Sequence, residues 1–134
     1  MKKILTALLF ALSILFAQCT PCPALTVKAT AYSFREPAHA PYGHLNCMGG
    51  VLDDTQIAAD TRYYPLGTIL EIDGLGRRIV TDRGSAIIGR YHIDVHFSNL
   101  TAMRRWGTRE VNIHVVKTRK ENVDFLTRRA FASL

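Results

Sequence analysis

Apolar and polar residues alternate along most of the chain, which is the pattern of short β-strands. The alternation predicts strands over residues 25–33, 67–72, 77–82, 92–97 and 109–117. The second and third of these flank Asp73-Gly74-Leu75-Gly76, a short turn of the kind that closes a hairpin. Many short strands with little helix predict a small closed or partly open β-barrel.

One short helix interrupts this pattern after residue 97. Its apolar stripe has helical spacing and precedes a glycine that ends it: Leu100, Met103, Trp106 and Gly107. Ser98 or Asn99 can cap its first turn, and we expect Trp106 to anchor it to the core. The segment 33–50, rich in Pro, Gly and His, predicts a loop.

An export signal precedes the strands. Two lysines are followed by the apolar run 4–16, which is too short to span a membrane comfortably. The cleavage point has two interpretations: lipidation of Cys19, which would then attach the chain to a membrane, or cleavage after Ala17 or Ala24. We therefore expect residues 1–24 to be a signal peptide and anchor region, with export to the periplasm or cell envelope.

The three cysteines are Cys19, Cys22 and Cys47. The first two have CxxC spacing but lie at the signal boundary and not in a βαβ unit, which disfavours a redox motif. A zinc ribbon would need a second cysteine pair. Lipidation of Cys19 would leave Cys22 and Cys47 free to pair, whereas cleavage after Ala24 would leave Cys47 as a small buried residue.

The charge of the chain is mildly basic, with a formal net charge of +6 at pH 7. This excess favours polyanionic partners such as cell-wall polymers or lipid head groups. It is too small and dispersed to indicate nucleic acid, and no RNA- or DNA-reading motif is present in the sequence. The basic tail, residues 119–134, carries a weak helical stripe, which predicts a short docking helix or, alternatively, a surface-binding one.

Two histidines and a carboxylate, His92, Asp94 and His96, share one side of a predicted strand and raise the question of a metal site. The two histidines would lie about 13 Å apart along the backbone. Metal–nitrogen bonds are only about 2.1 Å long, so a single ion would bend the strand badly. A distant ligand such as His39 or His44 keeps a metal alternative open, but we expect no metal and a solvent-facing side for the histidines.

Three aspartates lie where they could act together. Asp60 ends the run IAAD, Asp82 ends RRIVTD, and Asp94 alternates with core-facing neighbours, so it points to the other surface of the barrel. A single aspartate at a strand end is usually a turn former or a cap. Three neighbouring carboxyl groups cannot all ionise, and a retained proton is what a general acid needs to cleave a glycosidic bond.

The order of these motifs resembles the 3D domain family, which is named for three aspartates. The resemblance spans roughly residues 26 to 117 and rests on the ordered series D…PLGT…D-x-G-S-A-I…G…I-D…WG. The segments that carry it are KATAYS (28–33), IAADTRYYPLGTILEI (57–72), VTDRGSAIIGRYHIDVHF (80–97) and AMRRWGTREVNIHVV (102–116). The family is similar to the C-terminal part of membrane-bound lytic transglycosylase A and to resuscitation-factor-like cell-wall proteins.

The resemblance implies a six-stranded double-psi β-barrel over residues 25–118 that cleaves peptidoglycan between N-acetylmuramic acid and N-acetylglucosamine, without metal or organic cofactor. Asp82 stands where the family's proposed catalytic acid stands. Its implied role is to protonate the leaving oxygen and then accept the proton of the muramic C6 hydroxyl, which leaves a 1,6-anhydro end. Asp60 and Asp94 would tune Asp82 and hold sugar hydroxyls.

Further residues are expected to bind substrate in the same groove: Thr30, Tyr32, Gly84, Ser85 and Ala86. Arg83 would lower the pKa of Asp82, but strand alternation should send its side chain to the opposite face. The stretch NCMGGVLDDTQ (46–56) replaces a Thr/Gly-rich stretch of relatives, so we expect one wall of the groove to differ. Two alternatives remain: a non-catalytic, expansin-like glycan-binding barrel, and a structural cell-wall protein with a decayed site.

Overall fold

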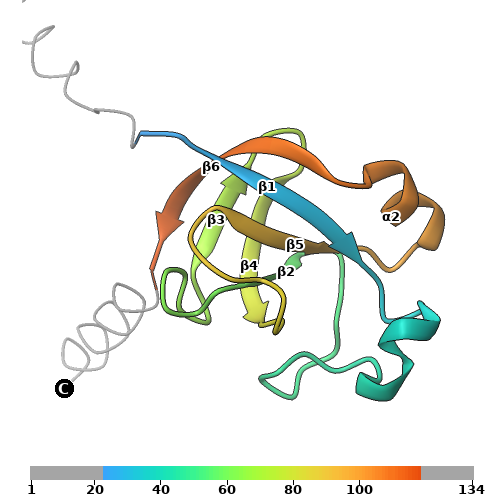
Figure 1. Ribbon diagram of the computed structural model, residues 1–134. Helices are drawn as coiled ribbons and strands as arrows, with labels where there is room; N and C mark the ends of the chain where they lie inside the picture. Colours follow the sequence, from blue (N-terminus) through green and yellow to red (C-terminus); the bar gives the residue numbers. More distant parts are fainter. Residues whose placement is uncertain (1–22, 119–134) are drawn as a thin grey trace, which may run out of the picture.

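The computed structural model describes residues 23–118 of the chain (Figure 1). Residues 1–22 of the expected signal peptide and anchor region, with Cys19 and Cys22, and the basic tail 119–134 lie outside the described residues. Within residues 23–118, none of the helices has the length and apolar character needed to cross a membrane.

Six strands close into one barrel. They are β1 (Leu25–Tyr32), β2 (Gln56–Ala59), β3 (Ile69–Ile72), β4 (Gly76–Asp82), β5 (His92–His96) and β6 (Arg109–Lys117). Their order around the barrel is β1-β5-β2-β4-β3-β6, so neighbours in space are mostly not neighbours in sequence. The β1–β5 and β2–β4 pairs are parallel and the remaining pairs are antiparallel. The predicted small six-stranded β-barrel is confirmed.

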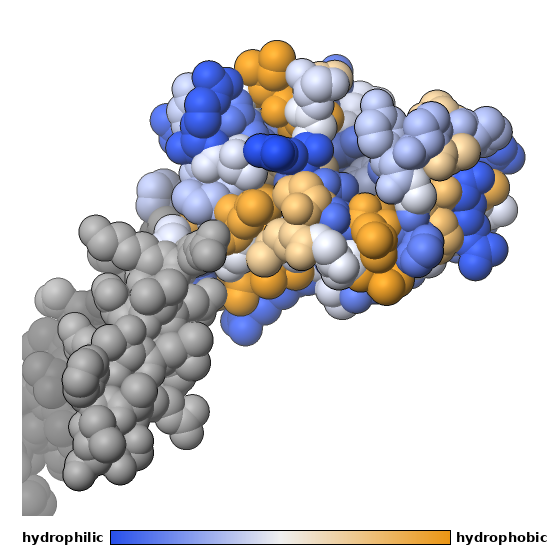
Figure 2. Space-filling model, turned by 90° about the horizontal axis from the view of Figure 1, so that it is seen from below, coloured by the Kyte–Doolittle hydropathy of each residue, from blue (hydrophilic) through white to orange (hydrophobic). Residues whose placement is uncertain are grey.

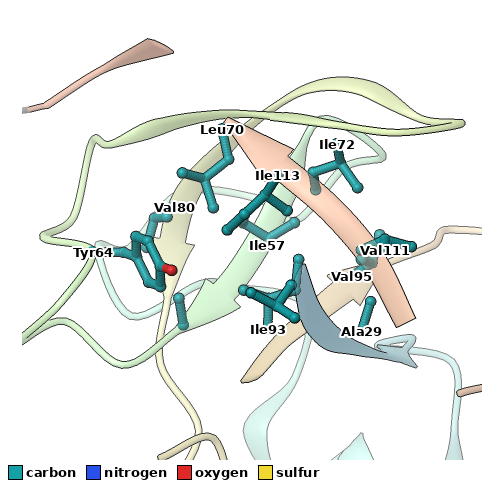
Figure 3. Close-up of a cluster of buried hydrophobic side chains, with 12 residues drawn as sticks. Ala29, Ile57, Tyr64, Leu70, Ile72, Val80, Ile93, Val95, Val111 and Ile113 are labelled. Atoms are coloured by element: carbon teal, nitrogen blue, oxygen red, sulfur yellow. The ribbon is translucent and has the colours of Figure 1, made fainter. Parts of the chain in front are cut away.

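The interior of the barrel is filled by alternate residues of the strands, because successive side chains point to opposite faces. On the face seen in Figure 2, apolar patches lie between hydrophilic side chains, whereas the enclosed cluster is apolar (Figure 3). Its members are Val27, Ala29, Ile57, Ala59, Tyr64, Leu70, Ile72, Val80, Ile93, Val95, Val111 and Ile113. Every strand contributes to this cluster, so the barrel has one shared core.

The expected hairpin and helix are both present. Strands β3 and β4 pair in antiparallel register, and Gly74 and Gly76 in the turn adopt positive φ values of 79° and 73°, which glycine tolerates best. The helix α2 (Leu100–Trp106) is capped by Asn99, whose side chain accepts a hydrogen bond from the Ala102 N–H at 3.0 Å.

Trp106 anchors this helix as expected. It is partly buried against the core cluster, and its ring centroid lies 5.8 Å from that of Phe97. Arg109 covers the outer face of the indole, with its guanidinium carbon 4.1 Å from the ring centroid. The helix therefore packs against the barrel by apolar contact.

The segment 33–50, predicted as a loop, contains a short 3-10 helix, η1 (Pro37–Tyr42), shown in teal in Figure 1. Pro37 opens it, because proline has a backbone angle suited to the first helical turn and needs no hydrogen-bond partner there. The segment then returns to the barrel through a bridge between Leu45 and Val51.

Asn46 ties this segment to the barrel. Its Oδ1 accepts hydrogen bonds from the backbone N–H groups of Met48 and Gly50, both at 3.0 Å. Its Nδ2 donates to Gln56 Oε1 at 2.8 Å, and Thr81 Oγ1 donates to the same oxygen at 2.7 Å. One buried amide therefore sets the position of the loop relative to β2 and β4.

Replacing Asn46 by alanine should lower the free energy of unfolding by about 1–3 kcal/mol, because the buried hydrogen bond to Gln56 and two part-buried hydrogen bonds from backbone N–H groups are lost. Urea denaturation measures the change. Asn112→Ala is the matched control, since Asn112 forms its hydrogen bonds at the exposed surface, and it should cost much less. Equal losses in the two variants would contradict the structural role of Asn46.

Candidate functional site

A groove with a cavity volume of about 700 Å³ lies between the segment 33–50 and the loop that follows β4. Asp82 and Asp94 both line it, as do four of the expected substrate-binding residues. These four are Tyr32, Gly84, Ser85 and Ala86. The groove therefore gathers two of the three aspartates with most of the residues expected around them.

Asp94 lies on β5 between two strands that pair with it. Its register partners are Thr30 on β1 and Ala58 on β2, and its chain neighbours Ile93 and Val95 are buried in the core. Thr30 Oγ1 donates a hydrogen bond to Asp94 Oδ1 at 2.8 Å. The expected substrate ligand Thr30 is thus hydrogen-bonded to the carboxyl group itself.

The protonation of Asp94 is set mainly by its surroundings. Burial raises the pKa of Asp94 to about 6; the Thr30 hydrogen bond opposes this shift, and the negative charges of Glu36 and Asp82 add to it. Asp94 therefore keeps its proton up to about pH 6.

Asp82 ends β4 and is held from three directions. Its Oδ1 accepts hydrogen bonds from the backbone N–H groups of Cys47 at 3.1 Å and Arg83 at 2.9 Å. The Tyr32 hydroxyl donates to Asp82 Oδ2 at 3.2 Å. Burial, and then the charges of Asp82 and Asp94, raise the pKa of Tyr32, so its hydroxyl stays protonated and able to donate.

Asp60 lies in a neighbouring hollow of about 380 Å³, on the other side of the loop after β4. Its carboxylate binds Arg62 Nη2 at 2.6 Å and Nε at 3.0 Å, and accepts a hydrogen bond from the Gly89 N–H at 2.8 Å. The Arg62 hydrogen bond, followed by that of Gly89, holds the pKa of Asp60 well below its usual range. The structure therefore brings Asp82 and Asp94 together and places Asp60 apart from them.

Arg83 does not point away from the site as expected. Strand β4 ends at Asp82, so Arg83 begins a loop in which strand alternation no longer applies. Arg83 lines both the groove and the neighbouring hollow. It thus forms part of the wall that separates Asp60 from the other two aspartates.

The histidines of β5 occupy different environments. His96 is fully buried, its Nδ1 lies 2.8 Å from the Asp53 carbonyl oxygen, and its ring stacks on Phe34 with centroids 5.5 Å apart. The expectation of a solvent-facing side is wrong for His96, because Phe34 and the segment that follows β1 cover it. His92 is half-buried, with Nε2 3.2 Å from Thr30 Oγ1. Across residues 23–118, no group of three His, Cys, Asp or Glu residues is placed to hold a metal ion.

Two features of the groove were missed by the sequence analysis. Cys47 is an exposed free thiol on its wall and not a small buried residue; its expected alternative partner, Cys22, lies outside the described residues. Tyr42 and Leu45, 75% and 46% exposed, also line the groove. The mixture of prolines, histidines and a tyrosine in the segment 33–50 was the available signal, but its position depends on contacts distant in sequence.

Replacing Asp94 by asparagine should stabilise the protein at pH 8 and leave its stability nearly unchanged at pH 4. The folded-state pKa is raised from 3.8 to about 6, so the folded protein binds the proton more tightly and loses stability as pH rises through this interval. Removing the group should recover up to about 3 kcal/mol above pH 6. Urea denaturation across pH measures this, with exposed Glu110→Gln as the control; a gain that is independent of pH would contradict the assignment.

The chain is similar to several known proteins over part of their length. "Putative cell wall shaping protein YabE" of Bacillus subtilis (strain 168) is 40% identical over 60 residues, which cover 45% of this chain and 14% of that protein. The crystal structure of the lytic transglycosylase MltA from Escherichia coli is 24% identical with a TM-score of 0.48, covering 55% of this chain and 27% of that one. The expansin of Clavibacter michiganensis is 20% identical with a TM-score of 0.51, covering 71% of this chain and 51% of that one.

This chain thus spans only a small part of YabE and about half or less of the two solved structures. The likeness to the expansin extends to the fold of the barrel. The 3D domain matches residues 55–117, which include all three aspartates but begin after β1. Over these residues the chain is similar to the 3D domain family.

Proposed function

We propose that this barrel binds and cleaves the glycan strands of peptidoglycan as a lytic transglycosylase, with Asp94 as the group that donates and accepts the proton. The observation that supports it best is the pKa of Asp94, raised to about 6 in a groove that also holds a second carboxylate. The match to the 3D domain family and the similarity to a cell-wall shaping protein favour the same substrate. The protein would act in the periplasm or cell envelope.

The reaction needs one carboxyl group. Protonated Asp94 donates its proton to the glycosidic oxygen as the bond from that oxygen to the anomeric carbon of the muramic acid breaks. The C6 hydroxyl of the same sugar then attacks the anomeric carbon and returns its proton to Asp94. The products are a 1,6-anhydro end and a free hydroxyl on the leaving sugar. Because the substrate supplies the nucleophile, this reaction consumes no water and uses no metal or organic cofactor.

Asp82 would act as the charged partner of Asp94. Its two oxygens already accept three hydrogen bonds from the protein, which suits a fixed negative charge near the positive charge that develops at the anomeric carbon. Family position instead favours Asp82 as the acid, and this assignment remains the rival within the same mechanism. If Asp94 is the acid, replacing Asp94 should reduce activity more than replacing Asp82. If Asp82 is the acid, the larger loss should follow replacement of Asp82.

A glycan-binding barrel without cleavage is the second candidate. It is favoured by the fold shared with an expansin and by the exposed Tyr42 and Leu45, whose side chains can pack against a sugar ring. In this case the two carboxyl groups would only accept or donate hydrogen bonds to sugar hydroxyls.

Asp94→Asn should reduce the release of anhydro-ended muropeptides from purified peptidoglycan by about 100-fold or more, the scale of a lost general acid. Asp82→Asn should cost less, and the exposed turn variant Asp73→Asn should remain active. Mass spectrometry of the soluble products measures all three. Anhydro ends indicate a lyase, reducing ends a hydrolase, and binding without products the expansin-like alternative. If Asp94→Asn keeps some activity and Asp82→Asn has none, Asp82 is the general acid and the assignment to Asp94 is wrong.

Activity should decline as pH rises through about 6, because the acid must be protonated when cleavage begins. Glu36→Gln and Asp82→Asn should each move the midpoint to lower pH, since both side chains carry charges that raise the pKa of Asp94. Asp60→Asn should leave the midpoint in place because its charge is already compensated by Arg62. A pH–rate profile of each variant is the measurement, and a midpoint that responds only to Asp60 would exclude Asp94 as the titrating group.

A further inference from the structure

The hollow that contains Asp60 lies directly beside the groove. Both are bordered by Arg83, Gly84, Ser85 and Ile87, so one loop forms a common wall between them. A sugar ring in the groove could therefore extend a substituent over this loop into the hollow, whose volume of about 380 Å³ suits a small branched group.

The two spaces differ in charge. Arg83 borders both spaces; the groove is otherwise lined by Asp82 and Asp94, whereas the hollow is otherwise lined by Arg62 and Asp60. Asp60 is paired with Arg62 at 2.6 Å, so these two charges offset each other. Among residues 23–118, no carboxylate forms an ion pair with the Arg83 guanidinium. The hollow therefore carries an excess positive charge immediately beside an acidic groove.

The other groups around the hollow suit a carboxylate on a short aliphatic arm. Ser85 is exposed and can donate a hydrogen bond from its hydroxyl, and arginine binds carboxylates through two parallel N–H groups. Ile88, which is 66% exposed, offers an apolar surface at the same edge. A neutral sugar could not form an ion pair with the Arg83 guanidinium.

Asp60 fixes the geometry of this hollow. It binds the Arg62 side chain and the Gly89 N–H, and Gly89 has a φ of 88°, a conformation that favours glycine. The far end of the common loop is thereby attached to the end of β2. Asp60 is a positioning residue for the loop that presents Arg83.

We propose that this second hollow binds the carboxylate-bearing substituent of an amino-sugar glycan whose ring lies in the groove, with Arg83 as the main anion ligand. The proposal rests on the proposed function, since it assumes a glycan in the groove. It assigns to this barrel a preference for acidic glycans, such as strands whose lactyl groups end in free or peptide-borne carboxylates, over neutral ones of the same length.

Calorimetric titration of the Asp94→Asn protein with two probes tests the proposal without cleavage. One probe is a neutral N-acetylglucosamine oligomer, and the other is a peptidoglycan oligosaccharide of equal length with free lactyl carboxylates. The acidic probe should bind more tightly, and added salt should weaken only its binding. Adding Arg83→Gln should weaken the acidic probe about tenfold or more and change the neutral probe less than twofold.

Arg104→Gln, which removes the same charge from the exposed face of α2, is the matched control and should alter neither affinity. Unchanged binding of the neutral probe shows that the Arg83 variant remains folded. Equal affinity for the two probes, or an equal loss of both on replacing Arg83, would overturn the acidic subsite while leaving the proposed function intact. Binding of neither probe would instead count against a glycan in the groove, and thus against the proposed function.

Discussion

The register of β5 between β1 and β2 is the constraint on which the site depends. It sends Ile93 and Val95 into the core and places Asp94 opposite Thr30 and Ala58. A slip of one residue would exchange these faces and bury the carboxyl group in the apolar cluster. The small side chain of Ala58 leaves room over Asp94, and Thr30 supplies its hydrogen bond. Core packing and the chemistry of the groove are therefore set by the same pairing.

The energetic cost of this arrangement falls mainly on the carboxyl group of Asp94. Asp94 is kept in a poorly hydrated position beside Glu36 and Asp82, which is unfavourable for an ionised carboxyl group and explains its raised pKa. The barrel tolerates the arrangement because closure satisfies the strand backbones and the twelve-residue cluster fills the interior. A stable frame is the usual setting for a destabilised functional group.

Local patterns predicted the parts of the fold that local forces determine. Strand alternation, the glycine-containing hairpin turn and the Asn99 cap all arise within a few residues. The errors lie where distant segments meet. The burial of His96 depends on the cover supplied by Phe34, and the position of Arg83 depends on where β4 ends. The grouping of Asp82 with Asp94 was predictable from the motif, but the separation of Asp60 required the three-dimensional path of the loop.

Asp60 and Asp94 show why the three aspartates need not share one task. Asp60 directly follows β2 and Asp94 lies within the neighbouring β5, yet their pKa values shift in opposite directions. Asp60 is bound by an arginine and a backbone N–H, whereas Asp94 is desolvated beside like charges. Exchanging their surroundings would exchange their protonation. An anchored, charged Asp60 cannot supply a proton, but it can hold the loop that separates an acidic groove from a basic hollow. The division of charge across that loop follows from the different partners of chemically identical side chains.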